Sequence, residues 1–535
     1  MNTLKAITCS AFAALLISSC GGAADIISTP LENIDNTPLK VSDLTEIEKH
    51  NWGHLDLVKD TIPGMSVDKA YAEIIKNKKG KKVIVAVIDS GIDIDHEDLN
   101  DVIWTNKKEI PNNGIDDDKN GYIDDIHGWN FLGEAYNEQL EFVRILAKGD
   151  TSDPVYAKAQ AEYDEDYQKY MGYKNNYDQM LLQISNADAA LAKHLNKTDY
   201  TKADVNSIKT EDETLSRSVQ IAKYFYSNGL ESLSEGKEEL SNSLNQINDR
   251  LNYNLNKDFK GRINGDDADD MSTKFYGNGN VKPSVKTESH GTHVAGIIAA
   301  ERNNGKGVNG VANNVEIMSI RAVPNGDEYD KDIALAIRYA VDNGASIING
   351  SFGKYYSPHS DWVRDAIAYA GKNDVLFVNA AGNEGINLDE KDVYPNDAVG
   401  VGPEVSDTFI TVGALEPKYG SGIVAGFSNY GKINVDVFAP GAKVYSTVPE
   451  NEYDTKGGTS MAAPAVAGVA ALIRSYYPKL SAAQVKQVLM DSGLAVKSKV
   501  IVGGETSNVK PFGDLVKSSK MVNAYNALIM ASKMK

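Results

Sequence analysis

The sequence predicts an α/β fold in which a parallel sheet is flanked by helices and a helical hairpin is inserted. Short apolar runs rich in β-branched residues recur along the chain, and amphipathic stretches separate them. This alternation is typical of parallel sheets, because neighbouring parallel strands need crossover connections. The segment 134–275 breaks the alternation and repeats apolar residues at helical spacing. The chain is therefore expected to be an α/β domain with a large insertion.

The composition narrows the classes of function. The 535 residues include 55 Lys and Arg against 74 Asp and Glu, which gives a formal net charge of −19. This acidic balance argues against nucleic acid as the main partner, because phosphate binding needs a basic surface. Cysteine occurs only at Cys9 and Cys20. The sequence therefore excludes a disulfide-stapled protein and a thiolate–zinc protein.

The N-terminus is predicted to direct export. Lys5 precedes an apolar stretch that is shorter than the roughly 20 residues of a membrane span, so residues 1–19 are predicted to be a signal peptide. The segment Ile17–Cys20 resembles the lipobox of bacterial lipoproteins, which implies cleavage before Cys20 and lipidation of that cysteine. The protein is then expected to be exported and lipid-anchored in the bacterial cell envelope. A signal peptide followed by an incidental cysteine is the alternative.

Two parts of the chain, 66–133 and 276–535, are predicted to form the α/β domain, after a tether and surface wrap in residues 20–65. A short helix is expected over Ser66–Lys78, with Ser66 as its N-cap. The run Val83–Ile88 is unbroken and apolar, which is typical of a strand buried on both faces. Further strands are expected at Glu316–Ile320, Ile347–Asn349, Val375–Asn379 and Phe409–Val412, and helices at Asp332–Asn343 and Asp361–Gly371.

The insertion 134–275 is predicted to contain an antiparallel helical hairpin. Two stretches repeat apolar residues at steps of three and four, and a polar link joins them. The repeating residues are Tyr163, Tyr167, Tyr170, Tyr177, Leu181, Ile184, Leu191 and Leu195, then Leu233, Leu240, Leu244, Ile247, Leu251 and Leu255. The two apolar seams are expected to pack together. A purely structural role is the favoured interpretation, and a protein partner that docks on the insertion is the alternative.

An acidic loop in the first part of the chain follows the calcium-loop pattern. The candidate ligands are Asp116, Asp118, Asn120, Tyr122 and Asp124, with Gly121 at the sixth position. Consecutive aspartates repel one another unless a cation neutralises them. His127 stands at the twelfth position, where such loops carry a bidentate glutamate. A structural calcium ion is expected here, and a solvated acidic turn is the alternative.

Three further segments carry side chains suited to nucleophilic catalysis. Asp89–Gly91 directly follows the first buried strand, on the side where open α/β sheets build their sites. His290 opens a run of small and apolar residues that is expected to be a tightly packed helix. Ser460 lies in the glycine-rich segment Gly457–Pro464, which leads into a long Ala/Val/Leu helix.

Together these segments match the Asp, His and Ser motifs of the subtilisin-like serine proteases, in the chain order of that family. A fourth segment, Asn379–Asn383, resembles the oxyanion-hole segment of the family. The resemblance covers residues 71–133 and 276–494 and leaves out the insertion, which places His290 201 residues after Asp89. It implies a subtilisin-like fold and hydrolysis of peptide bonds.

The resemblance implies a role for each residue. Ser460 is the nucleophile, His290 accepts its proton and later donates it to the leaving amine, and Asp89 holds the imidazole tautomer. The Asn383 side-chain amide and the Ser460 backbone N–H form the oxyanion hole at a helix N-terminus. No cofactor is expected for catalysis. A catalytically inactive binding protein with the same fold is the alternative, whereas an α/β-hydrolase esterase is disfavoured because Gly-x-Ser-x-Gly is missing.

The resemblance also places the substrate, a protein or peptide, as an extended chain between two short segments. These segments are Ser351-Phe352-Gly353 and Ala380-Ala381-Gly382. Small residues there keep the walls low, so that a substrate side chain enters a specificity pocket. Close packing is the alternative reason for small residues at these positions.

Overall fold

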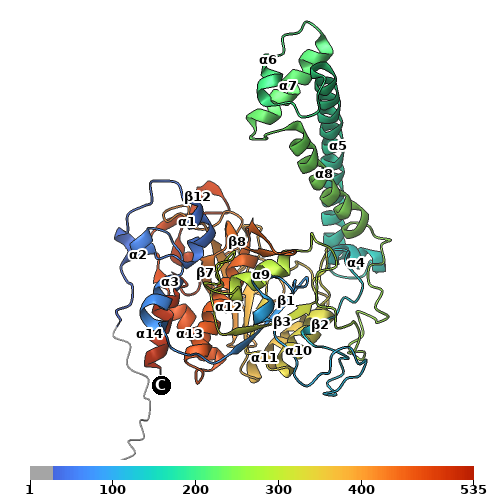
Figure 1. Cartoon of the computed structure of the whole chain (residues 1–535). Coiled ribbons are helices and arrows are strands. Elements are labelled where there is room, and N and C mark those ends of the chain that lie inside the picture. Colours follow the sequence, from blue (N-terminus) through green and yellow to red (C-terminus); the bar gives the residue numbers. More distant parts are fainter. Residues whose placement is uncertain (1–27, 535) are drawn as a thin grey trace, which may run out of the picture.

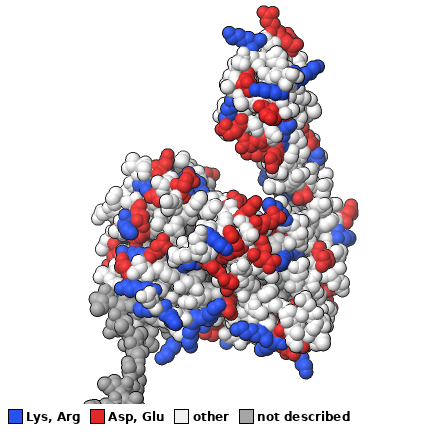
Figure 2. Space-filling model, in the orientation of Figure 1, with Lys and Arg blue, Asp and Glu red and all other residues white. Residues whose placement is uncertain are grey.

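The computed structural model describes residues 28–534. The predicted signal peptide and Cys20 lie outside this range. Among the described residues, no helix combines the length and apolar character that a bilayer crossing requires. Acidic side chains are distributed over both the compact body and a projecting arm in the view of Figure 2, in keeping with the net charge of −19.

The body is built on a mostly parallel sheet. Within residues 28–534 the sheet has nine strands in the order β10-β13-β7-β6-β5-β4-β1-β3-β2. Only the short edge pair β10 and β13 is antiparallel. The strands are β1 (Val83–Asp89), β2 (Gly128–Asn130), β3 (Val315–Arg321), β4 (Ile347–Gly350), β5 (Leu376–Ala380), β6 (Phe409–Leu415), β7 (Val437–Pro440), β10 (Leu494–Ala495) and β13 (Lys520–Met521). The predicted parallel sheet is confirmed, with strand ends that differ by one to three residues.

Helices cover both faces of the sheet (Figure 1). Along β1, Val85 and Val87 pack in one apolar core, whereas Ala86 and Ile88 pack in a second core on the opposite face. Alternating burial of this kind explains why the strand reads as a continuous apolar run. The first core includes α9 (His290–Ala299), α12 (Thr459–Tyr476), α13 (Ala482–Ser492) and α14 (Ala524–Lys533), and the second includes α10 (Asp330–Asp342) and α11 (Ser360–Lys372).

The remaining elements of the body are short. Two antiparallel hairpins are formed by β8 (Val444–Val448) with β9 (Glu452–Lys456) and by β11 (Lys499–Val502) with β12 (Glu505–Pro511). The single-turn helices are η1 (Ile34–Asn36), α1 (Glu46–Asn51), η2 (Trp52–His54), α2 (Leu57–Asp60), η4 (Asn100–Val102) and η6 (Phe512–Asp514). Trp52 is buried and its indole N–H donates to the Lys443 carbonyl at 3.0 Å, so the N-terminal segment packs on the body.

The helix expected at Ser66–Lys78 differs in form. It consists of α3 (Val67–Ala70) and the π-helical turn η3 (Tyr71–Ile75). Ser66 makes no capping hydrogen bond, because its hydroxyl accepts from the Asn523 side-chain amide at 2.8 Å instead. Ser66 occupies the predicted N-cap position, and its carbonyl accepts the Ala70 N–H at 3.0 Å, but its side chain does not cap the helix.

The insertion forms an arm that projects from the body (Figure 1). We define the arm as α5 (Tyr156–Leu195), α6 (Lys202–Ser207), α7 (Glu213–Ser227), α8 (Leu233–Asp249) and the π-helical turn η5 (Arg250–Asn254). Helices α5 and α8 run antiparallel, as ion pairs from Asp166 to Arg250 and from Asp188 to Lys237 show. The predicted hairpin is present, but the expected polar link contains the two further helices α6 and α7.

The arm has two separate apolar cores. The first, here the tip core, comprises Ile184, Ala187, Leu191, Tyr200, Val205, Val219, Ala222, Phe225, Leu233 and Leu240. The second, here the base core, comprises Leu140, Phe142, Val143, Ile145, Leu146, Ala159, Leu255 and Tyr356. The base core includes helix α4 (Glu141–Lys148) and a residue of the body, Tyr356. The base of the arm is therefore packed on the body, whereas the tip is packed on itself.

Candidate active site

Asp89 is the last residue of strand β1, and its surroundings fix its carboxylate. The side chain is buried, and Oδ1 accepts the backbone N–H of Ser90 at 2.8 Å. The Asp89 carbonyl accepts from the N–H groups of Ala322 and Val323, which follow the neighbouring strand β3. These bonds place the carboxylate at the carboxyl edge of the parallel sheet, where α/β folds build their sites.

His290 is the first residue of helix α9 and faces Asp89. Its Nδ1 lies 2.8 Å from Asp89 Oδ1 and 3.0 Å from Oδ2. Gly291 permits this approach, because a β-carbon at that position would collide with the carbonyl oxygen of Gly91. The fold thus brings together two predicted residues that are 201 positions apart in the chain.

The carboxylate changes the acidity of the imidazole. Burial opposes a charge on His290, but the negative charge and hydrogen bond of Asp89 outweigh burial and raise the pKa of His290 above its ordinary value of 6.5. The ring keeps 39% of its side-chain surface exposed, so its outer edge is open to solvent. An imidazole held in this way can accept a proton and carry the resulting charge beside a carboxylate. His293, one turn further on, is buried, which lowers its pKa to about 3 and leaves it neutral.

Ser460 is the second residue of helix α12. Its hydroxyl donates to the Ser351 carbonyl at 3.2 Å, and the Ser351 hydroxyl donates to the Ser460 carbonyl at 2.9 Å. Within the described residues, no hydrogen bond joins the Ser460 hydroxyl to His290. Rotation about the serine Cα–Cβ bond redirects the hydroxyl without moving the backbone, and such bonds often form only when substrate is bound.

Asn383 lies beside the start of the same helix. Its side-chain oxygen accepts the Thr459 N–H at 2.8 Å, which fixes the amide so that its NH₂ group points away from that bond. A β-carbon added to Gly458 would lie 3.5 Å from Asn383 Nδ2 and 3.6 Å from the Ser460 nitrogen. Two N–H donors therefore border one small space that glycine leaves empty. This arrangement suits a negatively charged oxygen.

The two predicted substrate segments lie on neighbouring strands. Ser351–Gly353 follows β4, and Ala380–Gly382 forms the end of β5 and the turn after it; β4 and β5 pair in parallel. The Gly382 N–H donates to the Thr459 hydroxyl at 3.0 Å, which ties the second segment to the helix that carries Ser460. Gly382 has φ +99°, and a β-carbon there would collide with Asn429. The side chains of Phe352 and Ala381 are buried, so the backbone is what these segments present.

The predicted calcium loop gathers part of its candidate ligands. Carboxylate oxygens of Asp116, Asp118 and Glu109 lie within 4.8 Å of one another. The Asp124 carboxylate instead accepts the N–H groups of Asn113 and Gly114. The Asn120 side-chain oxygen accepts the Tyr122 N–H at 2.8 Å, and the Tyr122 ring is buried among aromatic side chains, so its candidate ligand is the backbone carbonyl.

Glu109 was missed because it precedes the loop pattern by seven residues. It is 6% exposed, and one of its oxygens, Oε2, is buried without a hydrogen-bond partner. Its other oxygen accepts the Asp118 N–H at 2.9 Å. A buried carboxylate oxygen that lacks a donor is costly, and a cation would satisfy it.

Arg321 is a second residue that the sequence analysis missed. It ends strand β3, opposite Asp89, and its side chain is fully buried. Nε donates to the Ser90 carbonyl at 3.0 Å, and Nη2 contacts Glu288 Oε1 at 2.9 Å. Arg321 thus connects the segment that carries Asp89 to the segment that carries His290. An arginine at the end of an apolar run is the one signal that the sequence offered.

Comparison with known proteins places these features in context. The model of the subtilase family matches residues 80–513. A thermophilic serine proteinase of Bacillus sp. (strain AK1) is 43% identical over 188 residues, which cover 35% of this chain and 43% of the relative. Subtilisin DY of Bacillus licheniformis is 38% identical over 223 residues, which cover 41% of this chain and 76% of the relative. Thermitase of Thermoactinomyces vulgaris is 36% identical over 221 residues, which cover 41% and 70%.

Proposed function

The chain belongs to the subtilase family, and from this premise we propose that it is a serine endopeptidase that hydrolyses peptide bonds through Asp89, His290 and Ser460. The observation that carries the proposal is the Asp89–His290 hydrogen bond at 2.8 Å, formed between β1 and α9, which both contact the helix that bears Ser460. Its substrates are then proteins or peptides. Fold membership alone does not establish activity, since one fold hosts active and inactive proteins.

The proposed reaction begins when the Ser460 hydroxyl attacks the carbonyl carbon of the scissile bond. Its proton passes to His290 Nε2, while Asp89 holds Nδ1–H and stabilises the imidazolium. The tetrahedral intermediate then expels the amine, which takes the proton from His290, and leaves an acyl group on Ser460. Water, deprotonated by the same imidazole, hydrolyses this ester and restores the serine.

The negative oxygen of the intermediate needs donors that are already in place. In the proposal, Asn383 Nδ2 and the Ser460 N–H point at it from the two sides of the space beside Gly458. Donors held rigidly by the fold need no reorganisation during the reaction, so they favour the transition state over the bound substrate. The substrate main chain lies between the backbones of Ser351–Gly353 and Ala380–Gly382.

A fluorophosphonate probe tests the proposal against the alternative of an inactive binding protein. The probe reacts only with an activated serine, so we expect it to label the protein once per chain. Ser460→Ala should abolish labelling, whereas Ser227→Ala, a matched change on the arm, should leave labelling intact. Failure of the unaltered protein to label, or persistent labelling of the Ser460 variant, would contradict the assignment.

We also propose a structural calcium ion held by Asp116, Asp118 and Glu109. The unpartnered Glu109 oxygen supports this set over the purely sequential pattern. Asn120, Tyr122 and Asp124 remain candidates from the sequence. Calcium at about 100-fold above its Kd would stabilise the fold by about 2.7 kcal/mol. Chelation should therefore lower Tm by about 2–3 °C in the parent and not in Asp116→Asn; equal Tm with and without chelator would exclude the site.

Export and anchoring remain proposals from the sequence. Cys20 is then the lipidated first residue of a protein held in the bacterial cell envelope. Detergent-phase partition of the parent and of Cys20→Ser tests this: the parent should enter the detergent phase and the variant should not. The arm projects from the body in Figure 1. We propose that it limits the access of bulky folded proteins to the active site or binds a protein partner.

A further inference from the structure

The loop that follows the substrate segment Ser351–Gly353 contacts the base of the arm. Lys354 comes immediately after Gly353, and Tyr356 is two residues further along. The Lys354 N–H donates to the Tyr394 carbonyl and its carbonyl accepts the Tyr394 N–H, both at 2.9 Å. This backbone pair fixes one side of Lys354 to the body. The Lys354 side chain contacts Glu141 of α4, which lies at the base of the arm.

The Lys354 side chain is buried in a cage of oxygen atoms. Nζ lies 2.7 Å from Glu141 Oε2, 2.8 Å from the Glu328 carbonyl oxygen and 3.0 Å from Asp330 Oδ1. The side chains of Lys354 and Glu141 are 2% and 7% exposed, so solvent screens their attraction little. Removing one partner of such a pair leaves an uncompensated buried charge, which is strongly destabilising.

Glu141 is the first residue of α4, the helix that connects the body to the arm. Its backbone N–H donates to Asp327 Oδ2 at 2.8 Å, and its carboxylate also contacts Arg144 at 2.5 Å. Arg144 in turn donates to the carbonyls of Gln139 and Glu328. Burial opposes charge on Glu141, but Arg144 and Lys354 outweigh it and lower its pKa to about 2.

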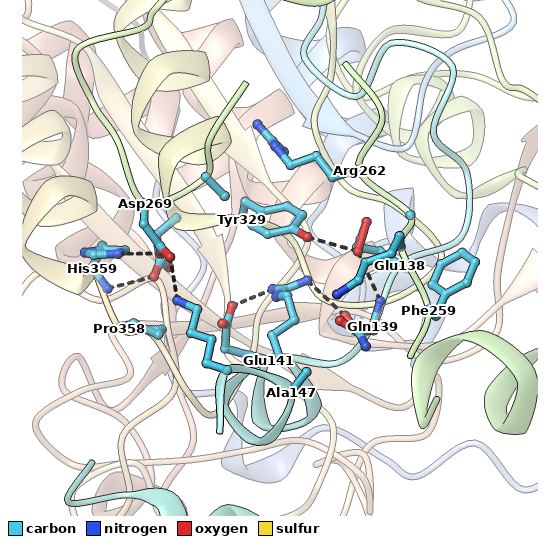
Figure 3. Close-up of a pocket in the computed structure, with 16 residues that line it drawn as sticks. Glu138, Gln139, Glu141, Ala147, Phe259, Arg262, Asp269, Tyr329, Pro358 and His359 are labelled. Carbon is cyan, nitrogen blue, oxygen red and sulfur yellow. Dashed lines mark hydrogen bonds and ion pairs between the residues drawn. The ribbon is translucent and has the colours of Figure 1, made fainter. Parts of the chain in front are cut away.

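A second contact joins the same loop to the arm. The Tyr356 hydroxyl donates to Glu162 Oε2 of α5 at 2.7 Å, and the ring packs against Phe142 of α4 with centroids 6.0 Å apart. Next to these groups a cavity of about 390 Å³ separates α4 from the loop at Pro358 and His359 (Figure 3). Polar bonds therefore hold the arm base to the body beside this cavity, in addition to the apolar contact of Tyr356 with the base core.

We propose that Glu141 and Lys354 are positioning residues through which the arm base fixes the substrate segment Ser351–Gly353. The inference rests on the proposed function, because it assumes that peptide main chain binds along this segment. The arm base then determines how strongly an extended peptide binds along this segment, whereas Asp89, His290 and Ser460 are carried by β1, α9 and α12. Neither Glu141 nor Lys354 touches the substrate.

The test compares two substrates on one variant. A single-residue nitrophenyl ester reaches Ser460 without using the length of the segment, whereas a peptide of several residues uses it. Glu141→Gln should raise KM for the long peptide about tenfold, which corresponds to about 1.4 kcal/mol of lost binding, with ester turnover unchanged. Asp188→Asn, which removes the charge of a half-buried ion pair in the arm tip, is the control and should alter neither substrate.

A second variant guards against loss of folding. The double change Glu141→Gln with Lys354→Met removes one negative and one positive charge together, and the glutamine side-chain oxygen can still accept from Arg144. It should keep the Tm and still show the raised KM for the long peptide. Equal effects on ester and peptide, or no effect on the peptide, would overturn the inference. Fluorophosphonate labelling at the parental rate with an unchanged peptide KM would refute only this inference, whereas absent labelling of the parent would refute the proposed function.

Discussion

Helices α12 and α5 show how differently the body and the arm are built. All residues of α12 from Met461 to Ile473 are buried, and the helix contacts several strands of the sheet. The 40-residue α5 has only four buried residues, Ala159, Ile184, Ala187 and Leu191. A helix that is apolar on all sides needs the whole body around it, whereas a mostly polar helix needs only a narrow stripe of contacts.

The ion pairs differ between the body and the arm in the same way as the helices. In the body, the buried pair of Arg321 and Glu288 joins distant segments, with side chains 0% and 3% exposed. In the arm, Lys174 and Asp178 form a local surface pair one turn apart, with side chains 35% and 44% exposed. Exposed pairs of this kind contribute about 0.3–0.5 kcal/mol, whereas breaking a buried pair costs about 3–5 kcal/mol. The body should therefore be intolerant of change and the arm tip tolerant.

Asp89→Asn should give the largest effect in the body. The amide cannot hold the required imidazole tautomer, so we expect kcat/KM on peptides to fall about 10⁴-fold. In the parent, kcat/KM should fall as pH drops below the raised pKa of His290, above 6.5, because a protonated imidazole cannot act as base. In the variant the acid limb should move to lower pH, since burial remains and the stabilising charge is gone. A loss of less than tenfold with an unmoved acid limb would contradict the role of Asp89.

Asn383→Ala should give an intermediate effect. It removes one donor to the oxygen that becomes negative, so we expect kcat to fall about 10²–10³-fold with little change in KM. Steady-state kinetics on a peptide, together with the Tm, measure this. Asn373→Ala, an exposed asparagine at the end of α11, is the control and should behave as the parent. Near-parental kcat in the Asn383 variant would show that the donor lies elsewhere.

Removal of the arm tip should give the smallest effect on peptide turnover. Replacing residues 175–245 with a short Gly/Ser linker deletes the whole tip core and keeps the base core. Because the tip is packed on itself, we expect short-peptide turnover within about twofold of the parent. Cleavage of a folded protein should rise if the arm limits access. A tenfold fall in peptide turnover would show that the tip supports the body.

The structure also shows why this deletion should be shorter than the insertion that the sequence predicts. The predicted insertion begins at residue 134, but Glu138, Glu141 and Arg144 bond to the body. A deletion from 134 to 260 would remove those contacts as well. It would therefore test the base and the tip together rather than the tip alone.

The fold was predictable where burial leaves a pattern in the chain. Strand β1 reads as an unbroken apolar run because both of its faces are buried, and Asp89 interrupts that run at its end. Four motifs were sufficient to predict the candidate active site, since they occur in the chain order of the family. Helices α6 and α7 were missed because their stripes are short and the link between the hairpin helices reads as polar.

Long-range polar contacts could not be predicted in the same way. Glu141 and Lys354 are 213 positions apart, and neither lies in a periodic pattern that would pair them. Glu109 falls outside the spacing of the calcium loop, and only the folded chain brings it to Asp116 and Asp118. Ser66 stands at the N-cap position that local rules predict, but its hydroxyl accepts from Asn523 rather than from the helix.

Two hydrogen-bonded asparagines lie where the chain leaves the body toward the arm and where it returns. Asn130 and Asn278, 148 positions apart, exchange backbone N–H···O bonds of 2.9 and 3.0 Å, and their side chains are also hydrogen-bonded. The free energy of closing a loop grows only with the logarithm of its length. The length of the enclosed segment therefore has little effect on the stability of this junction. A foreign module whose ends lie close together is therefore expected to be tolerated in place of the arm tip, provided that the enclosed residues that contact the body, such as Glu138 and Glu141, are kept.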